Sequence, residues 1–148
     1  MPWPTESEHQ DLIARFHEGT VPASEFTHPA HLVVGLWHAA SFDEATALTR
    51  MRAGILRLNA AHGTPNSDTR GYHETITRAY LVLLAQFARA NANLDGAVLA
   101  QALLSSPLAQ RDALFNYYSK DRLMSVEARR DWVEPDLRAL DGSSVSVG

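Results

Sequence analysis

The fold is indicated most directly by the stretch GYHETITRAYLVLLAQFARA, which spans residues 71–90. Its apolar side chains recur three or four residues apart, which places them on one face of an α-helix. That face consists of Ile76, Tyr80, Leu83, Leu84 and Phe87. A chain-breaking segment, Asn91-Ala92-Asn93, follows directly. The stretch therefore predicts an amphipathic helix that buries one side against the rest of the chain.

Helical signals continue on both sides of this stretch, and no strand-like alternation interrupts them. Caps mark the helix starts, as in Thr27-His28-Pro29, where a capping residue precedes a proline. We expect further helices over residues 6–18, 28–40, 43–62, 94–104, 106–118 and 125–132. The expected fold is therefore all-α: one domain over 1–148, built as a compact bundle of five to seven helices. Helices one to four should run up and down, and the tail 142–148 should be disordered.

Composition restricts the classes of function. The 148 residues carry a net charge of −4 without a basic stripe, which argues against nucleic acid as a partner. Cysteine is absent, so neither disulfides nor thiolate chemistry is expected. No apolar run approaches the roughly 20 residues of a membrane span, and the N-terminus lacks signal-peptide features. We therefore expect a cytoplasmic protein that does not engage a membrane.

Seven histidines stand out in this composition, and several continue apolar helix faces. Counting at 100° per residue places His31, Gly35 and His38 on one side of the second helix, with His28 adjacent. The small side chain of Gly35 leaves space on that side. His62 ends the apolar face of the third helix, and His73 begins that of the fourth.

The predicted topology brings these histidines together. Short connections make consecutive helices antiparallel neighbours, so the start of helix two, the end of helix three and the start of helix four share one end of the bundle. We expect His28, His31, His62 and His73 to meet there, with His17 at the rim. His38 lies about 10 Å further along its helix and should stay outside the cluster.

Converging imidazoles must be neutral, metal-bound or facing an anion, because protonated rings repel one another. Our first hypothesis assigns His28, His31 and His73 as ligands of one divalent transition metal (Zn, Fe, Ni or Mn). Glu74 and His62 would then act as catalytic acid–base groups or support the ligands.

Two other interpretations stay open beside the metal site. In the first, a metal-free polar pocket binds a small-molecule substrate, with Tyr72 and Thr77 in its lining and Arg70 steering anions at its mouth. In the second, the histidines only cap helix ends or bind loop carbonyls. For Thr77, lining the pocket and bonding back to a carbonyl of its own helix are equally compatible with the sequence.

Three motifs carry a resemblance to a known group. They are Phe26-Thr27-His28-Pro29-Ala30-His31-Leu32 (FxHxxHL), Gly71-Tyr72-His73-Glu74-Thr75-Ile76-Thr77 (GYHETIT) and Tyr117-Tyr118-Ser119. The chain resembles a family of small bacterial helical proteins of unknown function, from about Thr20 to Leu140. The resemblance implies a bacterial cytoplasmic protein and implies no activity.

Three functions follow as hypotheses. The first is a small-molecule enzyme that uses a metal or histidine acid–base chemistry in a pocket at one end of the bundle. The second is a non-catalytic module that binds a small ligand in the same pocket. The third is a protein-interaction module with structural histidines, in which Trp37 or Trp132 contacts a partner or forms a homodimer.

Overall fold

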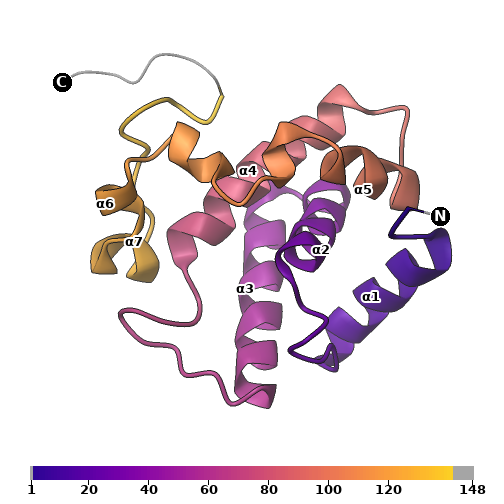
Figure 1. Cartoon of the computed structure of the whole chain (residues 1–148), viewed down its shortest axis with the longest axis horizontal. Coiled ribbons are helices and arrows are strands. Elements are labelled where there is room, and N and C mark those ends of the chain that lie inside the picture. Colours follow the sequence, from indigo (N-terminus) through magenta and orange to yellow (C-terminus); the bar gives the residue numbers. More distant parts are fainter. Residues whose placement is uncertain (1, 142–148) are drawn as a thin grey trace.

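The computed structural model describes residues 2–141 and confirms an all-α architecture over that range (Figure 1). The expected disorder of residues 142–148 lies outside the described residues. The α-helices are α1 (Glu6–Glu18), α2 (His28–Ser41), α3 (Glu44–Ala61), α4 (Glu74–Ala90), α5 (Gly96–Leu104), α6 (Lys120–Leu123) and α7 (Val126–Arg130). Two short 3₁₀ turns, η1 (Pro107–Ala109) and η2 (Ala113–Asn116), join α5 to α6.

Helix α2 occupies the middle of the bundle, as Figure 1 shows, and contacts α1, α3, α4 and α5. Its sequence is apolar almost all round, as expected of a helix without a solvent face. The buried positions are Ala30, Leu32, Val33, Val34, Gly35, Leu36 and His38. Thr27 caps the start of the helix, because its hydroxyl accepts a hydrogen bond from the Ala30 amide.

Helices α2 and α4 form the most extensive contact of the bundle and run in the same direction. Near their starts, the rings of His28 and Tyr80 lie 6.1 Å apart. Further along, a Cβ atom at Gly35 would lie 3.0 Å from Leu84 Cδ1. Glycine at position 35 thus permits close helix approach. The expected meeting of the two helix starts is therefore found in the structure.

The start of α4 differs from the expectation, since the helix begins at Glu74 and not at Gly71. Gly71 has a φ of +86°, and a Cβ atom there would lie 2.5 Å from the carbonyl oxygen of Pro65. Only glycine tolerates this combination of positive φ and close backbone approach. The loop therefore continues to His73, which is the N-cap residue.

The prediction of one α-helix over residues 106–118 is wrong. Gln110 has extended geometry and separates the two 3₁₀ turns, so no continuous α-helix forms. Tertiary packing outweighs helix propensity here: Tyr118 is fully buried, and its hydroxyl donates to the Val133 carbonyl at 2.8 Å. The short helix α6 that follows was not expected from the sequence. It begins after Ser119, whose hydroxyl accepts from the Arg122 amide.

Among the described residues, no helix combines the length and the apolar character needed to cross a bilayer.

Gly54 provides a test of the packing between α1 and α3. A Cβ atom there would clash with the ring of Phe16, which is almost fully buried. We expect Gly54→Ala to lower the free energy of unfolding by about 1–3 kcal/mol, despite alanine's better helix propensity. Urea denaturation measures the change. Ala53→Ser, an exposed change on the same helix, should stay within about 0.5 kcal/mol. Equal stability of Gly54→Ala and the wild type would contradict this packing.

Candidate functional site

A pocket lies between the N-terminal halves of α2 and α4, where the sequence predicts the histidine cluster. We call it the histidine pocket, and its volume is about 330 Å³. Two of the expected histidines, His28 and His31, and the expected Thr77 contribute to its wall. The full lining is His28, His31, Leu32, Gly35, Met51, Ile55, Ile76, Thr77, Tyr80, Leu81, Leu84 and Arg111.

Helix periodicity explains why these side chains share one pocket. On α2, His28, His31 and Gly35 are separated by three and four residues and therefore line one side. On α4, Thr77 and Tyr80 follow the same spacing and face them. The missing side chain of Gly35 lets Leu84 approach α2, and both residues form part of the pocket wall.

His31 is the side chain of the histidine pocket that can accept a hydrogen bond or a proton. Its Nδ1–H donates to the Thr27 carbonyl at 3.0 Å, which fixes the tautomer because a carbonyl oxygen only accepts. Its ring lies against Phe26, with centroids 3.7 Å apart. The Nε2 atom has no hydrogen-bond partner within residues 2–141 and is left as an acceptor. Burial lowers the pKa of His31, so the ring is neutral at pH 7.

His28 adds a second neutral imidazole. Its Nε2–H donates to the Ala109 carbonyl at 3.2 Å, which ties α2 to the turn η1. Burial lowers the pKa of His28, and the nearby Arg111 guanidinium lowers it further. Tyr80 faces His28, and burial raises the pKa of its phenol, so the hydroxyl stays protonated and can donate.

His73 lies outside the histidine pocket and caps α4. Its Nδ1 accepts from the Ile76 amide at 3.1 Å, and its Nε2–H donates to the Leu123 carbonyl at 2.8 Å. Both ring nitrogens are thereby used. Burial lowers the pKa of His73, which favours the neutral tautomer that both bonds require. The side chain faces α6 and supports the fold.

His62 also has a structural contact. Its ring bonds the Val21 carbonyl at 2.7 Å and holds the α1–α2 connector against the end of α3. His17, expected at the rim of the cluster, instead lies beside Trp37 and His38, with ring centroids 5.2 and 5.4 Å away. His17 was predicted near the start of α2 but lies beside the C-terminal half of that helix, so this prediction is wrong.

Glu74 is bound by two neighbours instead of facing the histidine pocket. Arg52 Nε donates to one carboxylate oxygen at 3.0 Å, and the Tyr72 hydroxyl donates to the same oxygen at 2.6 Å. Burial acts to raise the pKa of Glu74, but these two donors outweigh it and the pKa is lowered. Arg70 is exposed on the 62–73 loop and does not line the histidine pocket.

The expected metal ligands are therefore not assembled. Within residues 2–141, no three His, Asp or Glu side chains are arranged to hold a metal ion. His28 and His31 share the histidine pocket, whereas the nitrogens of His73 are both committed to main-chain groups. The zinc, iron, nickel or manganese site of the first hypothesis has no ligand geometry in this part of the chain.

Thr77 satisfies both alternatives that the sequence left open. It lines the histidine pocket, and its hydroxyl donates to the His73 carbonyl one turn earlier, at 2.9 Å. Tyr80 and Arg111 line the same pocket but were missed as polar pocket groups. The helical spacing of Tyr80 could have revealed it, whereas Arg111 arrives through an irregular segment that has no local signal.

Comparisons with protein-family models, curated proteins and solved structures find no match to this chain. The resemblance to a bacterial family stays a prediction.

His38 is a fully buried histidine outside the histidine pocket, as expected. Its Nδ1–H donates to the Val34 carbonyl at 2.8 Å, and its Nε2 has no hydrogen-bond partner within the described residues. The rings of Phe16, Trp37 and Phe42 lie against it. Burial lowers the pKa of His38 to about 4, so protonation of this ring opposes folding.

The capping role of His73 can be measured directly. His73→Ala removes the cap and leaves the Leu123 carbonyl without its partner, so we expect a loss of about 2–4 kcal/mol in unfolding free energy. His73→Asn restores a capping oxygen and should recover about 1 kcal/mol of that loss. Chemical denaturation gives both values. An alanine variant as stable as the wild type would show that the ring is free for another role.

His38 also predicts a pH dependence. Folding lowers its pKa from about 6.5 to about 4, so its contribution is complete above pH 6.5 and is lost as the pH falls toward 4. His38→Leu should remove up to about 3 kcal/mol of the difference in stability between pH 7 and pH 4. Urea denaturation across this range tests it. Phe42→Leu, a neighbouring change without a titrating group, should retain the wild-type slope. An unchanged slope in His38→Leu would refute the assignment.

Proposed function

We propose that this protein binds a small, largely apolar molecule in the histidine pocket, and that His31 Nε2 accepts a hydrogen bond or a proton from it. The observation that carries the proposal is the Nε2 acceptor of the neutral His31 ring, left without a partner within the described residues in a preformed pocket. A half-buried acceptor in such a place is stabilised when a ligand supplies the donor.

The size and lining of the histidine pocket define the class of ligand. A volume of about 330 Å³ falls at the lower end of the range for small-molecule sites. The aliphatic side chains of Leu32, Met51 and Leu84 suit an apolar body such as a substituted ring. Arg111 at the rim adds a positive charge, which favours a ligand whose polar end is weakly acidic.

The orientation of His31 suits general base catalysis. The Thr27 carbonyl holds Nδ1–H, so a proton taken up at Nε2 yields an imidazolium that this carbonyl stabilises. The proton would come from a hydroxyl or an acidic C–H of the ligand. The protonated Tyr80 hydroxyl offers a donor in the same pocket. The proposed reaction class is therefore proton transfer within a small molecule, or activation of its hydroxyl group.

Binding without chemistry is the second candidate, and one observation favours it. The Thr77 hydroxyl, the one aliphatic hydroxyl in the lining, already donates to the His73 carbonyl. The pocket thus lacks an activated serine or threonine nucleophile. In this alternative, His31 and Arg111 only orient a ligand.

4-Fluorophenol serves as a probe, because it combines an aromatic body with one weakly acidic hydroxyl. We expect it to bind with a dissociation constant of about 1 mM or tighter, measured through its ¹⁹F NMR signal. 4-Fluoroanisole lacks the donor and should bind about tenfold more weakly. His31→Phe should remove this difference between the two probes, since it removes the acceptor and keeps a ring. His62→Gln changes a histidine outside the pocket and should preserve the difference.

The pH profile provides a second readout. Because the pKa of His31 is lowered, probe affinity should stay constant from pH 8 to about 6.5 and fall in more acidic solution as Nε2 becomes protonated. Equal affinity for both probes in the wild type would overturn the role of His31. A catalytic role further requires that His31→Phe abolish deuterium exchange at an acidic C–H of a bound compound; binding without exchange leaves the second candidate.

A further inference from the structure

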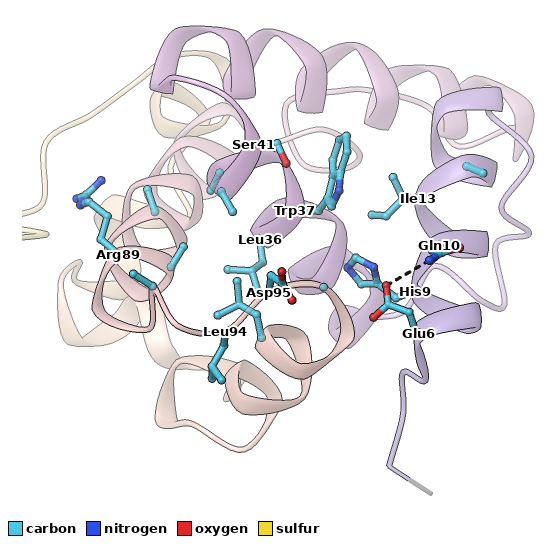
Figure 2. Close-up of a pocket in the computed structure, with 18 of the residues that line it drawn as sticks. Glu6, His9, Gln10, Ile13, Leu36, Trp37, Ser41, Arg89, Leu94 and Asp95 are labelled. Atoms are coloured by element: carbon cyan, nitrogen blue, oxygen red, sulfur yellow. Dashed lines mark hydrogen bonds between the residues drawn. The ribbon is translucent and has the colours of Figure 1, made fainter.

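A second and larger cavity lies at the opposite end of the α2–α4 contact. We call it the α1 cavity, and its volume is about 830 Å³. Its walls come from α1, from the C-terminal halves of α2 and α4, and from the start of α5 (Figure 2). It shares no lining residue with the histidine pocket, so a ligand there would be independent of the proposed function.

Small side chains from three helices and from the turn after α4 form part of its walls. An alanine extends only one carbon from the backbone, so these residues leave space and add apolar surface. They are Ala14, Ala39, Ala40, Ala85, Ala88 and Ala92. Trp37 and His17 add aromatic rings, which meet edge to face at a centroid distance of 5.2 Å. Such a combination of apolar side chains and ring edges suits an aromatic molecule.

His9 is a buried polar residue in the wall of the α1 cavity. Its side chain is only 6% exposed, yet neither ring nitrogen has a hydrogen-bond partner within the described residues. Figure 2 shows the ring reaching from α1 into the space in front of α2. Burial lowers the pKa of His9 against the opposing effect of Glu6, so the ring is neutral and presents one donor and one acceptor. A ligand in the cavity can pair with both of these nitrogens.

Trp37 presents a further free donor. Its indole N–H has no hydrogen-bond partner within residues 2–141, and the side chain is half-buried in the cavity wall. An occupant can therefore accept from Trp37 as well as exchange hydrogen bonds with His9.

The charges around the cavity exclude an anionic head group near His9. Glu6 lies beside His9 on α1, with its carboxylate accepting from the Ala97 amide at 3.1 Å. Asp95 also lines the cavity, and no hydrogen bond of its carboxylate caps α5. Two carboxylates repel an anion, while the N–H groups of His9 and Trp37 do not attract a cation. Arg89 lies across the cavity from α1 in Figure 2.

We propose that the α1 cavity binds a neutral, planar heteroaromatic molecule whose ring edge carries both a hydrogen-bond donor and an acceptor. The ring plane lies on the alanine surface, and its polar edge faces His9 and Trp37. Molecules that lack either the donor or the acceptor leave one nitrogen of His9 unpaired and bind more weakly.

Benzimidazole is a suitable probe, because it is planar and neutral at pH 7 and carries one N–H and one acceptor nitrogen. The chain has three tryptophans, of which only Trp37 lines the α1 cavity. In ¹H–¹⁵N spectra of the indole groups, the Trp37 signal, assigned with Trp37→Phe, should shift saturably on titration. The expected dissociation constant is about 1 mM or tighter. 1-Methylbenzimidazole lacks the donor and should bind at least about tenfold more weakly.

Two variants locate the interaction. His9→Phe keeps an aromatic ring without polar atoms and should weaken benzimidazole at least about tenfold. Ala88→Leu fills the alanine surface and should abolish binding, whereas His62→Gln, far from the cavity, should leave it unchanged. Equal binding of the two probes to the wild type would overturn the proposal even if His9→Phe failed to fold. So would a shift of the Trp132 signal in place of that of Trp37.

Discussion

The close contact between α2 and α4 is the constraint on which the rest of the molecule depends. Because both helices run in the same direction, their starts meet at one end of the bundle and their ends meet at the other. Gly35 allows the approach, and Leu84 fills the space above it. Where the contact opens, at either end, small or absent side chains leave a cavity. The histidine pocket and the α1 cavity are therefore two consequences of one packing arrangement.

Burial of α2 also dictates how the histidines behave. An imidazole inside a protein is costly when charged, and it remains neutral if it gives its one N–H to an acceptor. Four histidines whose pKa burial lowers bond a main-chain carbonyl in this way: His28 to Ala109, His31 to Thr27, His38 to Val34 and His73 to Leu123. Each neutral ring keeps one acceptor nitrogen, and the surroundings of that nitrogen determine the role of the residue.

These surroundings separate the structural rings from the ring on which the proposed function rests. In His73 the second nitrogen accepts from the α4 backbone, so both nitrogens have partners and the residue acts as a helix cap. In His38 the second nitrogen is buried among aromatic rings. This burial lowers the pKa of His38 and makes the fold sensitive to acid. In His31 the second nitrogen remains open in a preformed pocket. His9 differs from all of these because both of its nitrogens lack partners within the described residues, and the ligand that we propose for its cavity therefore both donates and accepts.

The sequence by itself determined the helices and the convergence of two helix starts, because periodicity, caps and short connections are local properties. Thr27 caps the helix for which the sequence nominated it. It also placed His28 and His31 beside the small Gly35. Only the tertiary structure decided that His73 bonds Leu123, fifty residues further on, and that the α-helix expected over 106–118 gives way to 3₁₀ turns. The partner of a ring nitrogen depends on which distant backbone packs beside it, and no local pattern encodes that choice.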